Sequence, residues 1–374
     1  MTESMDAASG GAVSSGAVSG GAASGEADEV PVPGESLADR VRAIFGDVPG
    51  PQLPSHADVA LWRHATVDDI DAMHHAQRAA DLVDHPSWTT PREDIADSFD
   101  LPEIDPQRDM VVGLGDDGAV IALGTTLRHP DSSERVKVYM TGAVHPDWRR
   151  RGIGAALAKW QHARALEHLV SIDTTLPGEI DMYAGAGSGA VVIAERYGLQ
   201  TARWFTSMVR DMSIEIPELE VRDGFEFVAY SAERAEEARL ARNDAFRDHW
   251  GSLPSQPERW MQFVGGPFIR PDLSTLAIAD GRIVAFCLAS VNEEDWVTLG
   301  ASNSYIDLIG VVRDHRGKGL APRVIARTLA AIRAAGLEKA VLDVDTDSPT
   351  GANALYERLG FEATEREQAL TREF

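Results

Sequence analysis

The chain carries the same succession of sequence patterns twice, and this repeat constrains its fold more than any other feature. The turn RRRGIG begins at Arg149 and the turn RGKGLA at Arg316, and a helical pattern closes each half at Gly198 and Gly360. The two separations are nearly equal, as duplication of one domain would produce. We therefore expect two domains of similar fold, and a length of 374 residues fits that expectation.

Each half contains strands, a turn and helices in the same order. In the second half, Asp280-Gly281 lies between two apolar runs and predicts a β-hairpin. The apolar segment YIDLIGVV then leads through RGKGLA into a segment with apolar residues at helical spacing, followed by KAVLDVD and GANALYERLGF. In the first half, Asp117-Gly118 takes the hairpin position and VYMTGAV leads into RRRGIG. The order is that of a sheet flanked by helices.

Composition narrows the class of protein. Residues 1–34 are rich in Gly, Ala and Ser and contain no aromatic residue, so we expect a disordered tail. A net charge of −24 argues against nucleic-acid binding, although it could draw cationic small molecules toward a cleft. No apolar run is long enough for a membrane span. The single cysteine, Cys287, favours the reducing cytoplasm.

The basic, glycine-rich turns predict an anion site. The pattern alone is common, but both copies follow an apolar strand and precede an amphipathic helix. In that setting glycine lets successive amide N–H groups point into one concavity, and the helix N-terminus adds partial positive charge. A nucleotide P-loop is excluded, because Val312 and Gly319 stand where that motif needs Gly and Ser or Thr. The hairpin strands ahead of the turn exclude a dinucleotide-binding fold.

With IGVVRDHRGKGLA followed by DTDSPTGANALYERLGF, the second half resembles the GNAT superfamily of acetyl-CoA-dependent N-acetyltransferases. The resemblance covers nearly the whole chain after the tail, twice. It implies an α+β (α/β) fold with two tandem GNAT-like domains, each a mixed, mostly antiparallel sheet flanked by helices. We place the N-terminal domain at residues 57–215 and the C-terminal domain at residues 222–374, with the boundary within 216–224. The tandem architecture also resembles that of the mycothiol synthases, which acetylate a cysteinyl amine.

The resemblance implies acetyl-CoA as co-substrate and no metal. Amides of the second turn are expected to grip the pyrophosphate. The preceding strand is expected to splay from its neighbour and to bind the pantetheine and the thioester carbonyl through backbone groups. The residues concerned are Ile309, Gly310 and Val311 in the strand and Arg316, Gly317, Lys318, Gly319, Leu320 and Ala321 in the turn.

Tyr356 occupies the position where the family usually places the tyrosine that protonates the departing thiolate. A phenol with a pKa of about 10 is protonated at neutral pH and can donate to that sulfur. The amine would then attack the thioester directly, with no covalent enzyme intermediate. The alternative is that Tyr356 only packs the last helix.

The chain departs from the family pattern at several positions. Ser348 stands where the family often has Asn. In the first half, Ala194 aligns with Tyr356 and Leu199 with Phe361, so we expect that half to be non-catalytic. Its turn is intact and could still hold acetyl-CoA through Arg149, Arg151, Gly152 and Gly154.

The general base and the acceptor stay open at this point. Candidate bases are Asp307, Asp343, Asp345 and His249 beside Trp250. The favoured function is N-acetylation of a primary amine on a small molecule or peptide by a cytoplasmic enzyme that could form a homodimer. The alternatives are a non-catalytic acyl-CoA-binding or sensor protein and a transferase for a longer acyl-CoA.

Overall fold

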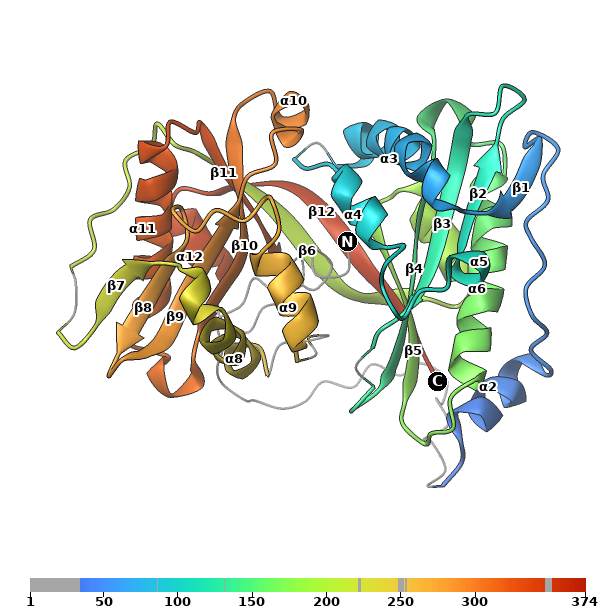
Figure 1. The fold of residues 1–374 in the computed structure, drawn as a ribbon, viewed down its shortest axis with the longest axis horizontal. Helices are drawn as coiled ribbons and strands as arrows, with labels where there is room; N and C mark the ends of the chain where they lie inside the picture. Colours follow the sequence, from blue (N-terminus) through green and yellow to red (C-terminus); the bar gives the residue numbers. More distant parts are fainter. Residues whose placement is uncertain are drawn as a thin grey trace. The chain divides into compact units, whose positions relative to one another are not determined.

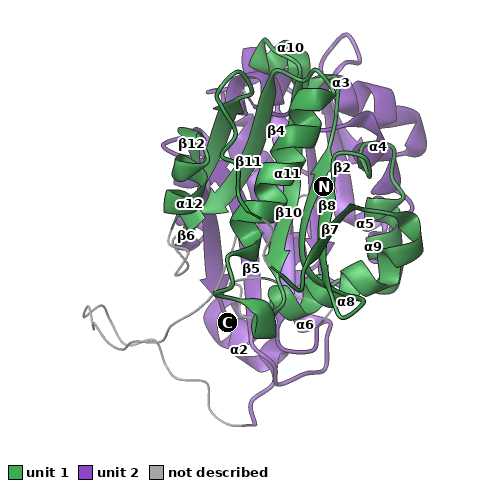
Figure 2. Ribbon diagram, turned by 90° about the vertical axis from the view of Figure 1, so that its left-hand side faces the viewer, with its two compact units in different colours: residues 1–17, 203–367 green, residues 18–202, 368–374 purple. Residues whose placement is uncertain are grey.

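The computed structural model describes residues 34–85, 87–130, 132–220, 223–247, 252, 254–346 and 352–374. Apart from Gly34, the predicted disordered tail lies outside these ranges. The described chain divides into two compact units (Figure 2). The N-terminal unit contains residues 34–202 and Gln368–Phe374, and the C-terminal unit contains Arg203–Glu367.

The division between the units falls inside two long strands rather than at residues 216–224, where the sequence analysis placed the boundary. Strand β6 (Gln200–Asp211) begins in the N-terminal unit and continues in the C-terminal unit, whereas β12 (Glu362–Glu373) does the reverse. The last residues of the chain therefore complete the N-terminal unit. There the amide of Gly178 donates to the carbonyl of Phe374 (3.1 Å), and the amide of Phe374 donates back (2.8 Å).

The N-terminal unit is a mixed, mostly antiparallel sheet flanked by helices (Figure 1). Its own strands run in the order β1–β2–β3–β4–β5, and only β4 and β5 are parallel. Helix α6 packs on β3 and β4, and α2 packs on α6. The strands are β1 (Leu61–His64), β2 (Met110–Leu114), β3 (Val120–Arg128), β4 (Val136–Val144) and β5 (Gly178–Gly185). The helices are α2 (Leu37–Phe45), α3 (Ile70–Asp84), α4 (Arg92–Asp97), α5 (Pro106–Asp109), α6 (Ile153–Val170) and α7 (Gly189–Arg196).

The C-terminal unit repeats this plan. From β6 its strands run in the order β6–β11–β10–β9–β8–β7, and only β10 and β11 are parallel among the registered pairs. Its further strands are β7 (Glu226–Ala229), β8 (Thr275–Ala279), β9 (Arg282–Ser290), β10 (Asn303–Val311) and β11 (Lys339–Asp345). Its helices are α8 (Ala235–Ala245), α9 (Pro257–Val264), α10 (Asp295–Leu299), α11 (Leu320–Ala334) and α12 (Ala352–Arg358).

Two apolar cores cover the two faces of the C-terminal sheet. Helices α11 and α12 pack on one face, against Ile306 and Ile309 of β10. Helices α8 and α9 pack on the other, against Leu308. The change of face between Ile306, Leu308 and Ile309 departs from strict alternation, which points to an irregularity in the middle of β10.

Both predicted hairpins are present. Asp280 and Gly281 join β8 to β9 with φ of 49° and 75°, a left-handed pair that suits a two-residue turn. Gly118 lies between β2 and β3 with φ of 80°. The sequence therefore predicted the strand–turn–strand units correctly from local turn chemistry.

Candidate active site

Strands β10 and β11 separate partway along their length. Their registered parallel pairing covers three residues of each strand and ends at Tyr305↔Val341. Beyond that point β10 continues to Val311, paired on its other side with β9. In an antiparallel pair only alternate N–H groups point to the partner, so the other backbone groups of this stretch face the opened side. The predicted cofactor-binding residues Ile309, Gly310 and Val311 lie on this stretch.

A bulge in β10 lies at the start of the opening. The register with β9 shifts between Ile306 and Leu308, which leaves Asp307 as the extra residue. The Asp307 side chain is half-buried, and its Oδ1 accepts a hydrogen bond from Ser290 Oγ (3.1 Å). Its Oδ2 is buried and has no hydrogen-bond partner among the described residues. Burial raises the pKa of Asp307 to about 7.

The second glycine-rich turn begins α11. Gly317 and Gly319 have φ of 71° and 69°, values that L side chains rarely adopt, and Gly319 is the N-cap. The backbone amides of Gly317, Lys318 and Gly319 donate no hydrogen bond to any other residue in the described part of the chain. Three successive free amides at a helix N-terminus form an anion-binding concavity. Arg316, Leu320 and Ala321 frame this turn, the last two buried in the core.

Two arginines hold the turn from either end. Arg316 Nη2 donates to the carbonyl of Ala245 at the end of α8 (2.8 Å), and burial together with Arg313 lowers its pKa from the ordinary value. Arg323 donates through Nη1 to the carbonyl of Gly319 (2.6 Å) and through Nε to the carbonyl of Glu220 (2.7 Å). The sequence analysis missed Arg323. Its spacing of four residues from Gly319, one helical turn, was the available signal.

Tyr356 lies on α12 with its side chain completely buried, in the same core as Ile309 and Cys287. Its ring makes an edge contact with Phe361 at 5.9 Å between centroids. Its hydroxyl is buried and has no hydrogen-bond partner among the described residues. Burial raises its pKa above the ordinary value, so the phenol stays protonated through the physiological range.

The remaining candidate bases have different surroundings. Asp343 Oδ2 accepts a hydrogen bond from Tyr305 Oη (2.6 Å), and its Oδ1 accepts one from Ser207 Oγ (2.5 Å). Asp345 is buried and already engaged by a neighbour. His249, Trp250 and Ser348 lie outside the described residues.

The turn of the N-terminal unit retains the backbone geometry. Gly152 is the N-cap of α6 with φ of 99°, and Gly154 follows in the first turn of the helix. The amides of Arg150, Arg151 and Gly152 likewise donate no hydrogen bond to a described residue. Arg149, however, forms a two-point ion pair with Asp84 (2.7 Å for both bonds).

The N-terminal unit lacks the chemical groups found beside the second turn. Strand β4 pairs with β3 without a shift of register, and its sequence VKVYMTGAV contains no carboxylate. At the position aligned with Tyr356, Ala194 is buried and offers no hydroxyl. The described part of this unit therefore lacks the bulge of β10 and the hydroxyl that Tyr356 presents.

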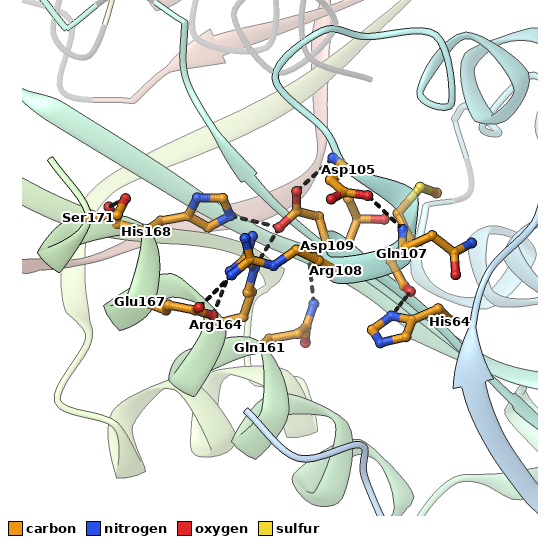
Figure 3. A network of polar contacts seen from close by, with 12 residues as sticks. His64, Asp105, Gln107, Arg108, Asp109, Gln161, Arg164, Glu167, His168 and Ser171 are labelled. Carbon is orange, nitrogen blue, oxygen red and sulfur yellow. Dashed lines mark hydrogen bonds and ion pairs between the residues drawn. The ribbon is translucent and has the colours of Figure 1, made fainter. Parts of the chain in front are cut away.

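A buried polar network in the N-terminal unit joins α5 to α6 (Figure 3). Asp109 accepts hydrogen bonds from Arg164 (2.6 Å) and from His168 Nε2 (2.9 Å). Burial opposes ionisation of Asp109, but these two bonds outweigh it and hold the pKa below its ordinary value. Arg164 and Arg108 both pair with Glu167, which completes the network. Because every charge has a partner, we interpret this network as structural.

Two kinds of feature are absent from the described ranges. None of the helices there combines the length and the apolar character that crossing a membrane requires. Within the same ranges, no group of three or more His, Cys, Asp or Glu side chains is arranged to hold a metal ion.

The sequence is similar to those of known acetyltransferases. The model of the acetyltransferase (GNAT) family matches residues 70–185 and again residues 235–361. A mycothiol acetyltransferase from Salinispora tropica is 32% identical over 231 residues, which cover 59% of this chain and 68% of that protein.

The fold is similar to those of two solved acetyltransferase structures. A GCN5-related N-acetyltransferase from Sphaerobacter thermophilus superposes with a TM-score of 0.63 and 23% identity, covering 84% of this chain and 95% of that one. A tandem GNAT protein from the clavulanic acid biosynthesis pathway superposes with a TM-score of 0.61 and 20% identity, covering 84% and 98%. At these identities the structural likeness shows the fold alone.

Proposed function

Because the chain belongs to the acetyltransferase (GNAT) family and is an N-acetyltransferase, we propose that its C-terminal unit transfers the acetyl group of acetyl-CoA to a primary amine of a small molecule or peptide. The observation that carries this proposal is that two buried polar groups lack a partner in the same unit in which β10 and β11 separate. Asp307 Oδ2 and the Tyr356 hydroxyl are both buried without a hydrogen-bond partner in the described chain. Buried polar atoms are rarely left unpaired unless a ligand or water completes them.

The second turn would hold the pyrophosphate of acetyl-CoA. The free amides of Gly317, Lys318 and Gly319 supply donors, and the N-terminus of α11 adds partial positive charge. A Cβ on Gly319 would lie 2.7 Å from Arg323 Nη1, so a side chain there would displace the arginine, and the positive φ of Gly319 disfavours one in any case. The opened side of β10 would then bind the pantetheine arm through its backbone groups.

Tyr356 would act as the general acid. When the amine attacks the thioester carbonyl, a tetrahedral intermediate forms, and its collapse breaks the carbon–sulfur bond. The thiolate leaves more readily if a proton reaches it as the bond breaks. A buried, protonated phenol with no competing partner is suited to supply that proton. Backbone N–H groups on the opened side of β10 would stabilise the oxyanion.

Asp307 would act as the general base. An ammonium group must lose a proton before it can attack, and a base is most effective when its pKa lies near the working pH. The pKa of Asp307, raised by burial to about 7, meets that condition, and its Oδ2 is unoccupied by any described residue. Asp343 is less suited, because Tyr305 and Ser207 already donate to its two oxygens.

We assign the N-terminal unit a non-catalytic role. Its turn keeps three free amides, but no carboxylate lies on β4 and Ala194 replaces the tyrosine. Arg149, which the sequence analysis proposed as a cofactor contact, is neutralised by Asp84. An anion at that turn would depend on the amides and on the charges of Arg150 and Arg151 in the same turn.

The relatives suggest the first acceptor to test. They are named mycothiol acetyltransferase, and the resemblance to mycothiol synthases implies a cysteinyl amine as acceptor. We propose that the acceptor is a small-molecule amine of this kind and that the enzyme acts in the cytoplasm.

Calorimetric titration of acetyl-CoA tests the proposal. We expect Gly319→Glu, which places bulk and negative charge in the second turn, to abolish binding at the catalytic unit. Gly152→Glu is the matched change in the first turn, where a Cβ would lie 3.2 Å from His56 Nε2. If acetyl-CoA fails to bind the unaltered protein, the acetyltransferase proposal is wrong. A site that survives Gly319→Glu but not Gly152→Glu would place a cofactor in the N-terminal unit as well.

A further inference from the structure

Strands β9 and β10 lie side by side in the C-terminal sheet (Figure 1), and Ser290 at the end of β9 contacts the proposed base on β10. Its Oγ donates to Asp307 Oδ1 (3.1 Å). Asp307 Oδ2 is buried without a hydrogen-bond partner in the described chain. The terminal torsion of an aspartate has only a broad preference, so a hydrogen bond that holds one oxygen also determines where the other points.

The bulge in β10 brings the two side chains together. Tyr305 pairs with Ser290 and Leu308 pairs with Leu288, so Asp307 is the extra residue. In a regular ladder Asp307 would instead lie opposite Leu288. Side chains of directly opposite residues lie on the same face of a sheet, so those of Tyr305 and Ser290 do, and the carboxylate of Asp307 joins them there.

Ser290 is itself held in place by its neighbours. Its backbone is paired with Tyr305 on one side and with Ile269, through an isolated bridge, on the other. The buried Ser304 donates through Oγ to the carbonyl of Ser290 (2.8 Å). A supporting residue orients a catalytic group well only when its own position is fixed, and Ser290 meets that condition.

The N-terminal unit has a different residue at the corresponding position. Tyr139 forms the last registered pair between β4 and β5, as Tyr305 does between β10 and β11. On the antiparallel side, Tyr305 lies opposite Ser290, whereas Tyr139 lies opposite Leu127. A leucine side chain cannot donate a hydrogen bond. The serine therefore occurs in the unit that has the bulged aspartate, and a leucine replaces it in the unit whose β4 has no carboxylate.

The groups around Asp307 act on its ionisation in opposite directions. Burial is the main cause that raises its pKa to about 7, and the charge of Asp295 on α10 adds to this effect. The hydrogen bonds from Ser290 and from the amide of Asp307 itself favour the ionised carboxylate. Tyr305 on β10 and Cys287 on β9 also act on Asp307, but their own pKa values are raised and both stay neutral near pH 7. Ser290 thus favours the state in which a base can accept a proton.

We propose that Ser290 is a positioning residue for the acetyl transfer: its hydroxyl turns the Asp307 carboxylate so that Oδ2 meets the reacting amine, and it stabilises the ionised form of that carboxylate. This inference rests on the proposed function, because it takes Asp307 as the base. A proton of the ammonium group passes to Oδ2, and the nitrogen lone pair is then free to attack the thioester. Ser290 acts only through Asp307.

Carbon-13 NMR of protein labelled at the aspartate carboxyl carbons measures the ionisation of Asp307 without acetyl-CoA or acceptor. The signal of Asp307 is the one that Asp307→Asn removes. In Ser290→Ala we expect the midpoint of its titration to rise by about one pH unit, because the ionised form loses a donor. Ser290→Thr keeps the hydroxyl and should restore the midpoint. Ser207→Ala removes the same kind of hydrogen bond from Asp343 and should leave the midpoint of Asp307 unchanged.

The rate of acetylation tests the link to catalysis, with saturating acetyl-CoA and S-methylcysteine amide as acceptor. A shift of about one unit leaves roughly a tenth rather than half of the Asp307 carboxylate ionised at pH 7. Ser290→Ala should therefore lower kcat/KM about fivefold at pH 7 and by less at pH 9. The ionisation of the acceptor is the same for every variant, so the difference belongs to the protein. In Asp307→Asn, adding Ser290→Ala should change the rate no further.

The outcomes separate this inference from the proposed function. If the midpoint of Asp307 stays near 7 in Ser290→Ala, or if Ser290→Ala lowers the rate equally in Asp307→Asn, Ser290 has no positioning role while the acetyltransferase proposal stands. A shifted midpoint without the pH-dependent loss of rate would mean that Asp307 is not the base, and this inference would fail with it. If acetyl-CoA does not bind the unaltered protein, the proposed function itself fails. Melting curves of Ser290→Ala and Ser290→Thr check folding.

Discussion

At the scale of single residues, the candidate site depends on groups that the fold leaves unsatisfied. The Tyr356 hydroxyl is buried in an apolar core, where a structural tyrosine would normally find a partner for its proton. Asp307 presents one oxygen to Ser290, and its other oxygen has no partner in the described chain. Each of the two side chains is held by its neighbours and still has one polar atom without a partner in the described chain.

Replacing Tyr356 by Phe tests the acid role. We expect kcat to fall by about 100-fold, at the lower end for loss of a general acid, because a thiolate is a fairly good leaving group. The affinity for acetyl-CoA should change little. Since the hydroxyl has no partner in the described chain, the melting temperature should not fall. Steady-state kinetics, calorimetry and a melting curve make the measurement. Parallel losses of stability and activity would indicate a packing role instead.

The sequence offered Tyr356 and the turn residues as site candidates because their chemistry is local, and their roles stay predictions. It left the base open among Asp307, Asp343, Asp345 and His249, since one carboxylate on a strand is like another until its neighbours are known. Arg323 was missed for a related reason. An arginine in the first turn of a helix usually faces solvent, and here two backbone carbonyls capture it.

At the scale of elements, the bulge distinguishes the two copies of the central strand. Strand β10 shifts register at Asp307, whereas β4 pairs regularly along its length with β3. The bulge takes one side chain out of the alternation of β10, close to where the pairing with β11 ends. Hydrophobic periodicity predicted a strand at both places but not the extra residue. A single interruption in so short an apolar run gives no periodic signal.

We expect the bulge in β10 to determine the pH dependence of the reaction, because burial at the bulge raises the pKa of Asp307. A base works only when deprotonated, so kcat/KM should rise with pH below about 7 and level off above it. In Asp307→Asn that limb should vanish and the rate at pH 8 should fall by about 100-fold or more. A pH–rate profile for both proteins makes the test, with Asp343→Asn as the matched variant. If the limb near pH 7 persists in Asp307→Asn, another group is the base.

At the scale of the whole molecule, the duplication predicted from the sequence is present, but each copy is not a continuous segment. The sequence analysis ended the first domain at residue 215, whereas the N-terminal unit runs to residue 202 and then takes up Gln368–Phe374. Helix α2 also extends it to residues before 57, by packing on α6. Sequence similarity between the halves reveals the duplicated segments. It does not reveal which sheet edge the last strand of the chain pairs with.

Removing residues 368–374 should therefore destabilise the N-terminal unit, although the deletion lies at the far end of the chain. Leu370 is fully buried in the core of that unit, and Phe374 packs at its edge. Leu370→Ala alone should cost about 2–5 kcal/mol of unfolding free energy. Denaturant unfolding of the two variants makes the measurement.

Deleting residues 1–34 is the control, since the tail predicted to be disordered should add nothing to a packed core and the unfolding transition should not shift. Equal effects of the two deletions would contradict either the tail prediction or the role of the last strand. The two truncations thus test one prediction from the sequence and one from the structure.

The return of the last strand also has a consequence for synthesis. A ribosome makes the chain from its amino end, so nearly all of the N-terminal unit is available long before residues 368–374 exist. Until they emerge, the edge of β5 that they will cover stays open, and an open strand edge is a site for pairing with other chains. The first unit to be synthesised is thus completed late, because it has to wait for residues 368–374.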